Sequence, residues 1–192
     1  MMIRNSVNVA LSASLLLIAQ AAVADLAGAY LLSLEDSQGR KLPLAQVQIR
    51  PQGADYSYQI DWHETQFENH FLSMRPFKCL PHAQRMICRL PYPYQLNRRI
   101  SENDLTDLEY DLLFLHKAPG EYGINGWNGL YYKLHSGGGG LLGELQETDL
   151  NVLQAPPEDG DLRPIDPMEI HPASDNLWPR RILIEPSEAV AK

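Results

Sequence analysis

The sequence predicts a mainly β protein, an antiparallel meander that forms a small barrel or a curved sheet. One amphipathic α-helix, at about residues 102–117, and an irregular proline-rich C-terminal segment complete the predicted fold. Several short segments alternate apolar and polar side chains with period two, which is typical of half-buried strands. Glycine-rich and proline-rich turns separate these segments, and one segment has helical periodicity. A two-sheet sandwich with an inserted helix is the main alternative.

The first half of the chain supplies most of the predicted strands. In residues 45–50, Ala45, Val47 and Ile49 fall on one face, and polar side chains fall on the other. Short strands with one polar face each indicate antiparallel pairing, because an antiparallel sheet can leave one face in water. The strands predicted in this half are residues 28–35, 45–50, 55–62 and 70–75.

A helix is predicted at residues 102–117 because four leucines recur at helical spacing: Leu105, Leu108, Leu112 and Leu115. Ser101 and Asp104 resemble a capping box at its start, and Pro119 with Gly120 ends it. The acidic side chains of this segment are expected to cap the helix and to form a solvated face with Arg98 and Arg99 as partners. An EF-hand is excluded because the acidic run has no central glycine.

The second half of the chain adds a hairpin and the C-terminal segment. Residues 129–134 and 141–147 alternate, and the glycines of residues 137–140 connect them as a loose turn. A phosphate-binding loop is excluded because no helix follows these glycines. Seven of the fourteen prolines lie in residues 156–186, and residues 180–186 are expected to form an edge strand.

The two cysteines are predicted to form a cross-strand disulfide. If Cys79 lies opposite Cys88 in a hairpin, Leu80 lies opposite Ile87, and residues 82–85 form the turn. One face then carries Phe77, Cys79, Met86, Cys88 and Leu90, so the same register that pairs the cysteines also segregates apolar side chains. A redox C-x-x-C motif and a zinc site are excluded by the spacing and by the shortage of further ligands. The disulfide is expected on the core side of the sheet.

The N-terminus is predicted to be a cleaved secretory signal peptide, residues 1–24. Arg4 precedes an apolar stretch, and Ala22-Val23-Ala24 provides a cleavage pattern. A single β-rich domain at residues 25–154 and a C-terminal extension at residues 155–192 would then form an exported protein, periplasmic or secreted. Without Arg4, the 16 Lys and Arg become 15 against 24 Asp and Glu, so the net charge changes from −8 to −9. This acidic balance argues against nucleic acid and anionic membranes as partners, and no stable membrane insertion is expected.

Aromatic side chains on or beside the predicted strands define a candidate surface for a ligand or a partner. The candidates are Trp62, Tyr122, Trp127, Tyr131 and Tyr132. Core packing is the favoured role for such residues, and a ligand cavity lined by aromatics is the functional alternative. A metal site at His63, Glu64 and His70 is the weaker alternative to ordinary structural roles, because the segment lacks the H-E-x-x-H spacing.

The leading functional hypothesis is a non-enzymatic exported module that binds a small apolar ligand or an envelope protein. The sequence contains no nucleophile elbow, and no catalytic residue or cofactor is predicted. One alternative is a periplasmic or secreted hydrolase with acid and base groups such as His63, Glu64, Glu68 and His70. The other is a structural or assembly protein that docks through its C-terminal segment.

Overall fold

The computed structural model describes residues 25–71, 76–82, 85–174 and 178–187. The predicted signal peptide and most of the strand predicted at 70–75 lie outside these residues. No helix among the described residues is long and apolar enough to cross a bilayer. The strands are β1 Gly28–Glu35, β2 Lys41–Gln52, β3 Asp55–Trp62, β4 Glu68–Phe71, β5 Pro76–Leu80, β6 Met86–Arg89, β7 Arg99–Ile100, β8 Phe114–Lys117, β9 Gly129–Gly137, β10 Gly140–Thr148, β11 Ile170–Pro172 and β12 Arg181–Pro186. The helix is α1 Thr106–Asp111, and the 3-10 turns are η1 Glu64–Gln66, η2 Gly126–Asn128, η3 Leu150–Gln154 and η4 Pro167–Glu169.

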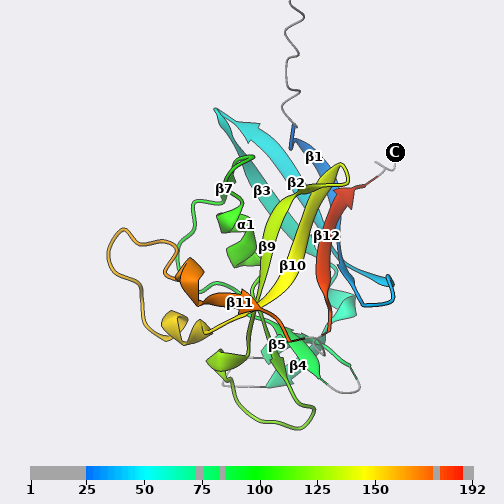
Figure 1. The fold of residues 1–192 in the computed structure, drawn as a ribbon, viewed down its shortest axis with the longest axis vertical. Coiled ribbons are helices and arrows are strands. Elements are labelled where there is room, and N and C mark those ends of the chain that lie inside the picture. The colour runs from blue at the N-terminus through cyan, green and yellow to red at the C-terminus, as the bar shows by residue number, and fades with distance from the viewer. Residues whose placement is uncertain (1–24, 72–75, 83–84, 175–177, 188–192) are drawn as a thin grey trace, which may run out of the picture.

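All of these strands belong to one curved antiparallel sheet (Figure 1). The strand order is β4-β5-β6-β8-β9-β10-β12-β1-β2-β3-β7, and β11 pairs with β10. The sheet therefore ends at β4 and at β7 and does not close into a barrel. The predicted mainly β class and the curved antiparallel sheet are confirmed.

The main hydrophobic core lies on one face of this sheet. Period-two alternation places Tyr30, Leu32 and Leu34 of β1 in the core, and the predicted face of Ala45, Val47 and Ile49 in β2 also lies there. Inward side chains of β2, β9, β10 and β12 contribute to it, as do three leucines of the helical region, Leu105, Leu108 and Leu112. The interior of the curve is thus filled by side chains.

Two smaller clusters lie on the opposite face. Tyr131 belongs to the second cluster, whereas its neighbours Leu130 and Tyr132 on β9 belong to the main core. In the same way Leu115 belongs to a third cluster, around the disulfide, while Phe114 points into the main core. The sheet is therefore covered on both faces in this region.

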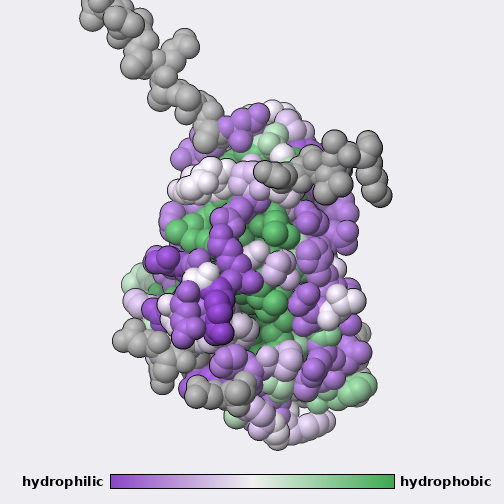
Figure 2. All heavy atoms as spheres, turned by 90° about the vertical axis from the view of Figure 1, so that its right-hand side faces the viewer, coloured by the Kyte–Doolittle hydropathy of each residue, from purple (hydrophilic) through white to green (hydrophobic). Residues whose placement is uncertain are grey.

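The C-terminal segment contributes a central strand. β12 lies between β10 and β1, and Ile182 and Ile184 are fully buried in the main core (Figure 1). The expectation of an edge strand at 180–186 is wrong, because β12 pairs along both of its sides. Figure 2 views this side of the molecule and shows a hydrophilic surface that hydrophobic patches interrupt.

The helix is shorter than the sequence predicted. α1 covers only Thr106–Asp111, and residues 114–117 form strand β8 between β6 and β9. Leu115 has the spacing of a helical face, yet it packs in the cluster around the disulfide. The run Leu113-Phe114-Leu115 is apolar on consecutive positions, which suits a strand that is covered on both faces.

The acidic residues of α1 do not form the solvated face that was expected. The side chain of Glu109 is 0% exposed and accepts hydrogen bonds from the Tyr131 hydroxyl, from Lys133 Nζ at 3.1 Å and from the Leu134 amide at 2.8 Å. Burial of a carboxylate is tolerated when cations and donors satisfy it. Glu109 therefore fixes α1 to β9.

Asp107, also buried, connects α1 to the C-terminal segment. Arg163 donates Nε to Asp107 Oδ1 at 2.7 Å and Nη1 to Asp104 at 2.7 Å, while the Arg99 amide donates to Asp107 Oδ2 at 3.1 Å. The predicted pairing with Arg98 is present at Asp111, at 3.2 Å. The Ser101 hydroxyl accepts from the Asp104 amide, but α1 begins only at Thr106, beyond this turn.

The predicted disulfide and its register are confirmed. Cys79 is bonded to Cys88, and β5 pairs with β6 at Cys79–Cys88 and at Leu80–Ile87. The side chains of the hairpin divide between two faces as expected. However, the face that carries the cysteines does not meet the main core, and the other face does. Leu80 and Ile87 enter the main core, whereas the fully buried cysteines belong to the third cluster on the opposite face.

Loss of the disulfide should destabilise the protein. The Cys79→Ala/Cys88→Ala variant is expected to lose about 2–3 kcal/mol of unfolding free energy, because the bond closes a short loop of the unfolded chain. Urea unfolding of the variant and of the oxidised wild type measures the difference. Reduction of the wild type should lower its stability, and the same reductant should leave the variant unchanged.

Neutralising Glu109 should weaken the attachment of α1. Glu109→Gln keeps the side-chain volume but replaces one acceptor oxygen by an NH2 group, which cannot accept from Tyr131 or Lys133, so a loss of about 1–3 kcal/mol is expected. Glu158→Gln, at an exposed position, is the matched control and should stay within about 0.5 kcal/mol of the wild type. Equal midpoints for the two variants in urea unfolding would contradict this role of Glu109.

Candidate functional site

An open cleft of about 640 Å³ lies beside the disulfide. Its lining comes from β5, from β6 and the chain that follows it, from β8, and from the two turns η2 and η3. Pockets of 300–1,000 Å³ with mainly apolar walls are typical of small-molecule sites. This cleft is therefore the candidate site.

One wall of the cleft exists because β5 and β6 pair over only two positions. Beyond the disulfide, Phe77 and Lys78 have no partner in β6, and the chain after Arg89 leaves the sheet as the segment Leu90-Pro91-Tyr92-Pro93. Prolines favour this departure because they cannot donate to a strand ladder. The cleft opens where the two chains diverge.

The opposite wall is formed by η2 and η3, which contact each other. Leu150 and Leu153 of η3 line the cleft together with Ile124 and Gly126. A Cβ atom on Gly126 would lie 2.4 Å from Asn151 Oδ1 and 2.8 Å from the Asn151 backbone nitrogen. The close approach of the two turns thus requires glycine at this position.

The cleft is a seam between the two smaller clusters. Leu90 packs against both of them, Leu115 belongs to the cluster of the disulfide, and Leu153 belongs to the cluster of Tyr131. All three leucines line the cleft. The apolar floor is consequently fixed by the disulfide on one side and by the contacts of α1 and η3 on the other.

Three charged side chains line the same cleft and contact each other. Glu64 accepts from Lys78 Nζ at 3.0 Å and from Arg89 Nη1 at 3.3 Å. The hydrogen bond and the charge of Lys78, aided by Arg89, hold the pKa of the Glu64 carboxyl below its usual value. The carboxylate is therefore charged at neutral pH and would accept, not donate, hydrogen bonds in any contact.

Arg89 is held by aromatic stacking as well as by charge. Its guanidinium carbon lies 3.7 Å from the ring centroid of Trp62 and 5.5 Å from that of Phe67. Such cation–π contacts stabilise an arginine and fix the plane of its donors. Burial lowers the pKa of Arg89 from its high usual value, while Glu64 opposes this effect.

A smaller cleft of about 280 Å³ lies on the other side of the same segment and shares Arg89, Leu90, Pro91 and Tyr92 with the first. Its acidic group is Asp111, whose Oδ2 accepts from the Tyr58 hydroxyl at 2.8 Å and from Arg98 Nε at 3.2 Å. Burial raises the pKa of Tyr58, so the hydroxyl stays protonated. Asp111, Tyr58 and Arg98 thus satisfy hydrogen-bonding groups of one another within this smaller cleft.

The five aromatic candidates do not gather in one place. Tyr131 and Tyr132 are buried on opposite faces of β9, and Trp62 is half-buried and packs against Phe67 and Phe114. Tyr122, in the loop that leads to η2, and Trp127, within η2, are 81% and 72% exposed next to the cleft. None of the five lines the 640 Å³ cleft.

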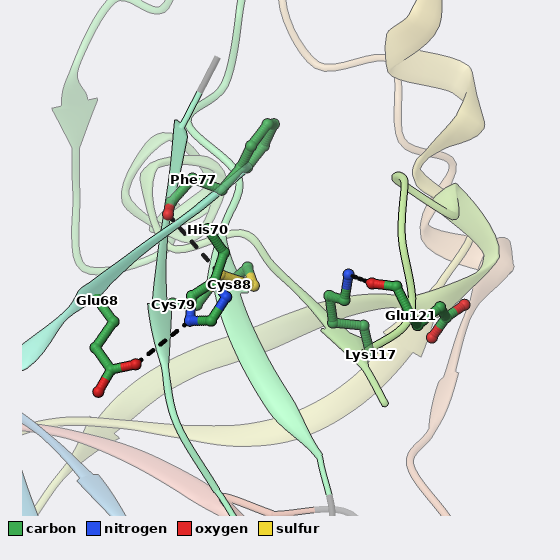
Figure 3. Close-up of a disulfide and its surroundings, with 7 residues drawn as sticks. All are labelled: Glu68, His70, Phe77, Cys79, Cys88, Lys117 and Glu121. Atoms are coloured by element: carbon green, nitrogen blue, oxygen red, sulfur yellow. Dashed lines mark hydrogen bonds and ion pairs between the residues drawn. A yellow bond between two sulfur atoms is a disulfide. The ribbon is translucent and has the colours of Figure 1, made fainter. Parts of the chain in front are cut away.

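The metal and acid–base candidates have separate roles. No group of three potential metal ligands exists among the described residues, which include His63, Glu64 and His70. Glu64 pairs with cations, and His70 Nε2 lies 3.4 Å from Glu68 beside the disulfide (Figure 3). A general acid needs a raised pKa, and that of Glu64 is lowered.

The cleft residues themselves were not identified from the sequence. Leu90, Leu115 and Leu153 belong to three segments that are distant along the chain, and only the fold joins them. One indication was present, since the alternation of Phe77 with Lys78 and of Arg89 with Leu90 places a charge beside an apolar residue at the open end of the hairpin. Comparison of the chain with family models, curated proteins and solved structures finds no match.

A side chain at Gly126 should disturb the cleft wall. Gly126→Ala is expected to destabilise the protein by about 1–3 kcal/mol, because the added methyl group overlaps Asn151. Gly137→Ala is the control, since its nearest neighbour would be Leu142 Cβ at 4.0 Å. Thermal unfolding compares the two variants, and a loss of stability at position 137 equal to that at 126 would refute the assignment.

Proposed function

We propose that this protein is an exported, non-enzymatic binding module whose 640 Å³ cleft holds a small apolar ligand. The observation that carries the proposal is the apolar seam itself: Leu90, Leu115 and Leu153 line an open cleft between two packed clusters. The interior of the curved sheet is filled, so the cleft takes the place of the barrel cavity considered from the sequence.

Export is supported by two features of the chain. The N-terminal segment has the pattern of a signal peptide, and the structure contains a disulfide between buried cysteines. Disulfides persist in oxidising compartments such as the periplasm and the extracellular space. We therefore place the binding activity outside the cytoplasm.

An exported protein partner is the second candidate. The observation that favours it is the exposure of Tyr122 and Trp127 on the loop beside the cleft, since exposed aromatics are enriched at protein interfaces. Docking on this loop would depend on Trp127, whereas a ligand within the cleft would not, because Trp127 does not line it. The Trp127→Ala variant thus separates the two candidates.

Apolar ligand binding can be measured with N-phenyl-1-naphthylamine, a neutral dye that fluoresces in apolar surroundings. The wild type is expected to enhance its fluorescence in a saturable titration. Ile124→Asp should weaken binding by about tenfold or more, since a carboxylate in the cleft must be desolvated next to the dye. Trp127→Ala should bind the dye like the wild type.

Val152→Asp is the matched control for this experiment. Val152 has the same exposed fraction as Ile124, 44%, and belongs to η3, but it does not line the cleft. It should therefore retain the affinity of the wild type. Failure of the wild type to bind the dye, or an equal loss of affinity in both aspartate variants, would refute the proposal.

A further inference from the structure

The charges that line the cleft do not cancel. Lys78 and Arg89 contribute two positive charges, and Glu64 contributes one negative charge; the other lining residues are uncharged. The cleft therefore carries a formal charge of +1 in a chain whose net charge is −8. A local charge opposite to that of the whole protein favours an anionic group in the cleft.

Arg89 is positioned to bind an anionic group. Among the described residues it donates one hydrogen bond to a carboxylate, from Nη1 to Glu64 at 3.3 Å, although a guanidinium has five N–H donors. The Trp62 ring at 3.7 Å fixes the plane of the guanidinium without using any of these donors. The Arg89 side chain is 17% exposed, so an anionic group that binds it would do so in a partly desolvated environment.

The cations lie next to apolar walls at the end of the hairpin where β5 and β6 separate. Phe77 precedes Lys78 at the start of β5, and Leu90 follows Arg89 at the end of β6. Successive side chains of a strand point to opposite faces, yet all four residues line the cleft, because it lies where β5 and β6 separate. The cleft thus joins an apolar floor to a pair of cations.

We propose that the ligand of this cleft is a single-chain carboxylic acid, with its apolar chain on Leu90, Leu115 and Leu153 and its carboxylate on Lys78 and Arg89. The planar guanidinium matches a carboxylate in shape. One negative charge also balances the +1 of the cleft, whereas a phosphate monoester would carry about −1.5 to −2. This inference rests on the proposed apolar binding function and adds the chemical class of the ligand.

The test compares decanoic acid with 1-decanol, which has the same chain and no charge. Both compete with bound N-phenyl-1-naphthylamine at pH 7.5, where the acid is ionised. Decanoate is expected to displace the dye at a concentration about tenfold or more below that of decanol, the effect of one charge-assisted hydrogen bond. Decyl phosphate should bind no better than decanoate.

Charge variants of the cleft should move this preference in opposite directions. Lys78→Gln should reduce the preference for decanoate over decanol by about threefold or more, and Glu64→Gln should increase it, because that carboxylate competes for the same donors. Lys41→Gln is the matched control, since Lys41 also forms an exposed ion pair, with Glu185 at 2.7 Å, but lies outside the cleft. The control should keep the preference of the wild type.

The possible outcomes separate this inference from the proposed function. Equal displacement by acid and alcohol, or a preference that Lys78→Gln and Glu64→Gln leave unchanged, would refute a carboxylic acid as the ligand. The proposed apolar binding function would then be unaffected. A clear preference for decyl phosphate would also overturn it. If the wild type binds no dye, the binding function itself fails and the inference fails with it.

Discussion

The buried carboxylate of Glu109 is the contact on which the arrangement of the two sheet faces depends. A helix of six residues is too short to be stable alone, so tertiary contacts must hold α1 in place. Glu109 binds Tyr131, Lys133 and the Leu134 amide of β9. Leu113, just beyond α1, accepts the backbone hydrogen bond of Leu90 at 2.9 Å, and Leu90 lines the cleft. The position of this apolar wall thus follows from an ionic contact one turn of chain away.

The hairpin around the cysteines and the strands of the first half were predictable because their patterns are local. The alternation in β1 and β3 gives the correct bounds, Gly28–Glu35 and Asp55–Trp62, and one register explains both the disulfide and the apolar faces. Which face of the hairpin meets the main core was not predictable, since both faces carry apolar residues. That choice depends on the distant side chains that cover each face.

The errors at the helix and at β12 have a common cause. Asp107 and Glu109 suggested a solvated helix, because the sequence does not show that Arg163 and Lys133 lie close enough to pair with them. Likewise the prolines around residues 181–186 indicated an edge strand, although Pro179 precedes β12 and Pro186 occupies only its last position, opposite Tyr30. The cleft could not be predicted from the sequence for the same reason, since Leu90, Leu115 and Leu153 become neighbours only when the sheet has formed.

The central place of β12 has a consequence for the order of folding. β1 comes first among the described strands and β10 is separated from it by most of the chain, yet both complete their hydrogen bonding only with residues 181–186. Until those residues emerge, two inner strands of the sheet keep an open edge, and Ile182 and Ile184 are missing from the core. Pairing between such distant segments is slow to form. The sheet can therefore be completed only after residues 181–186 have emerged, and until then β1 and β10 lack the strand that joins them.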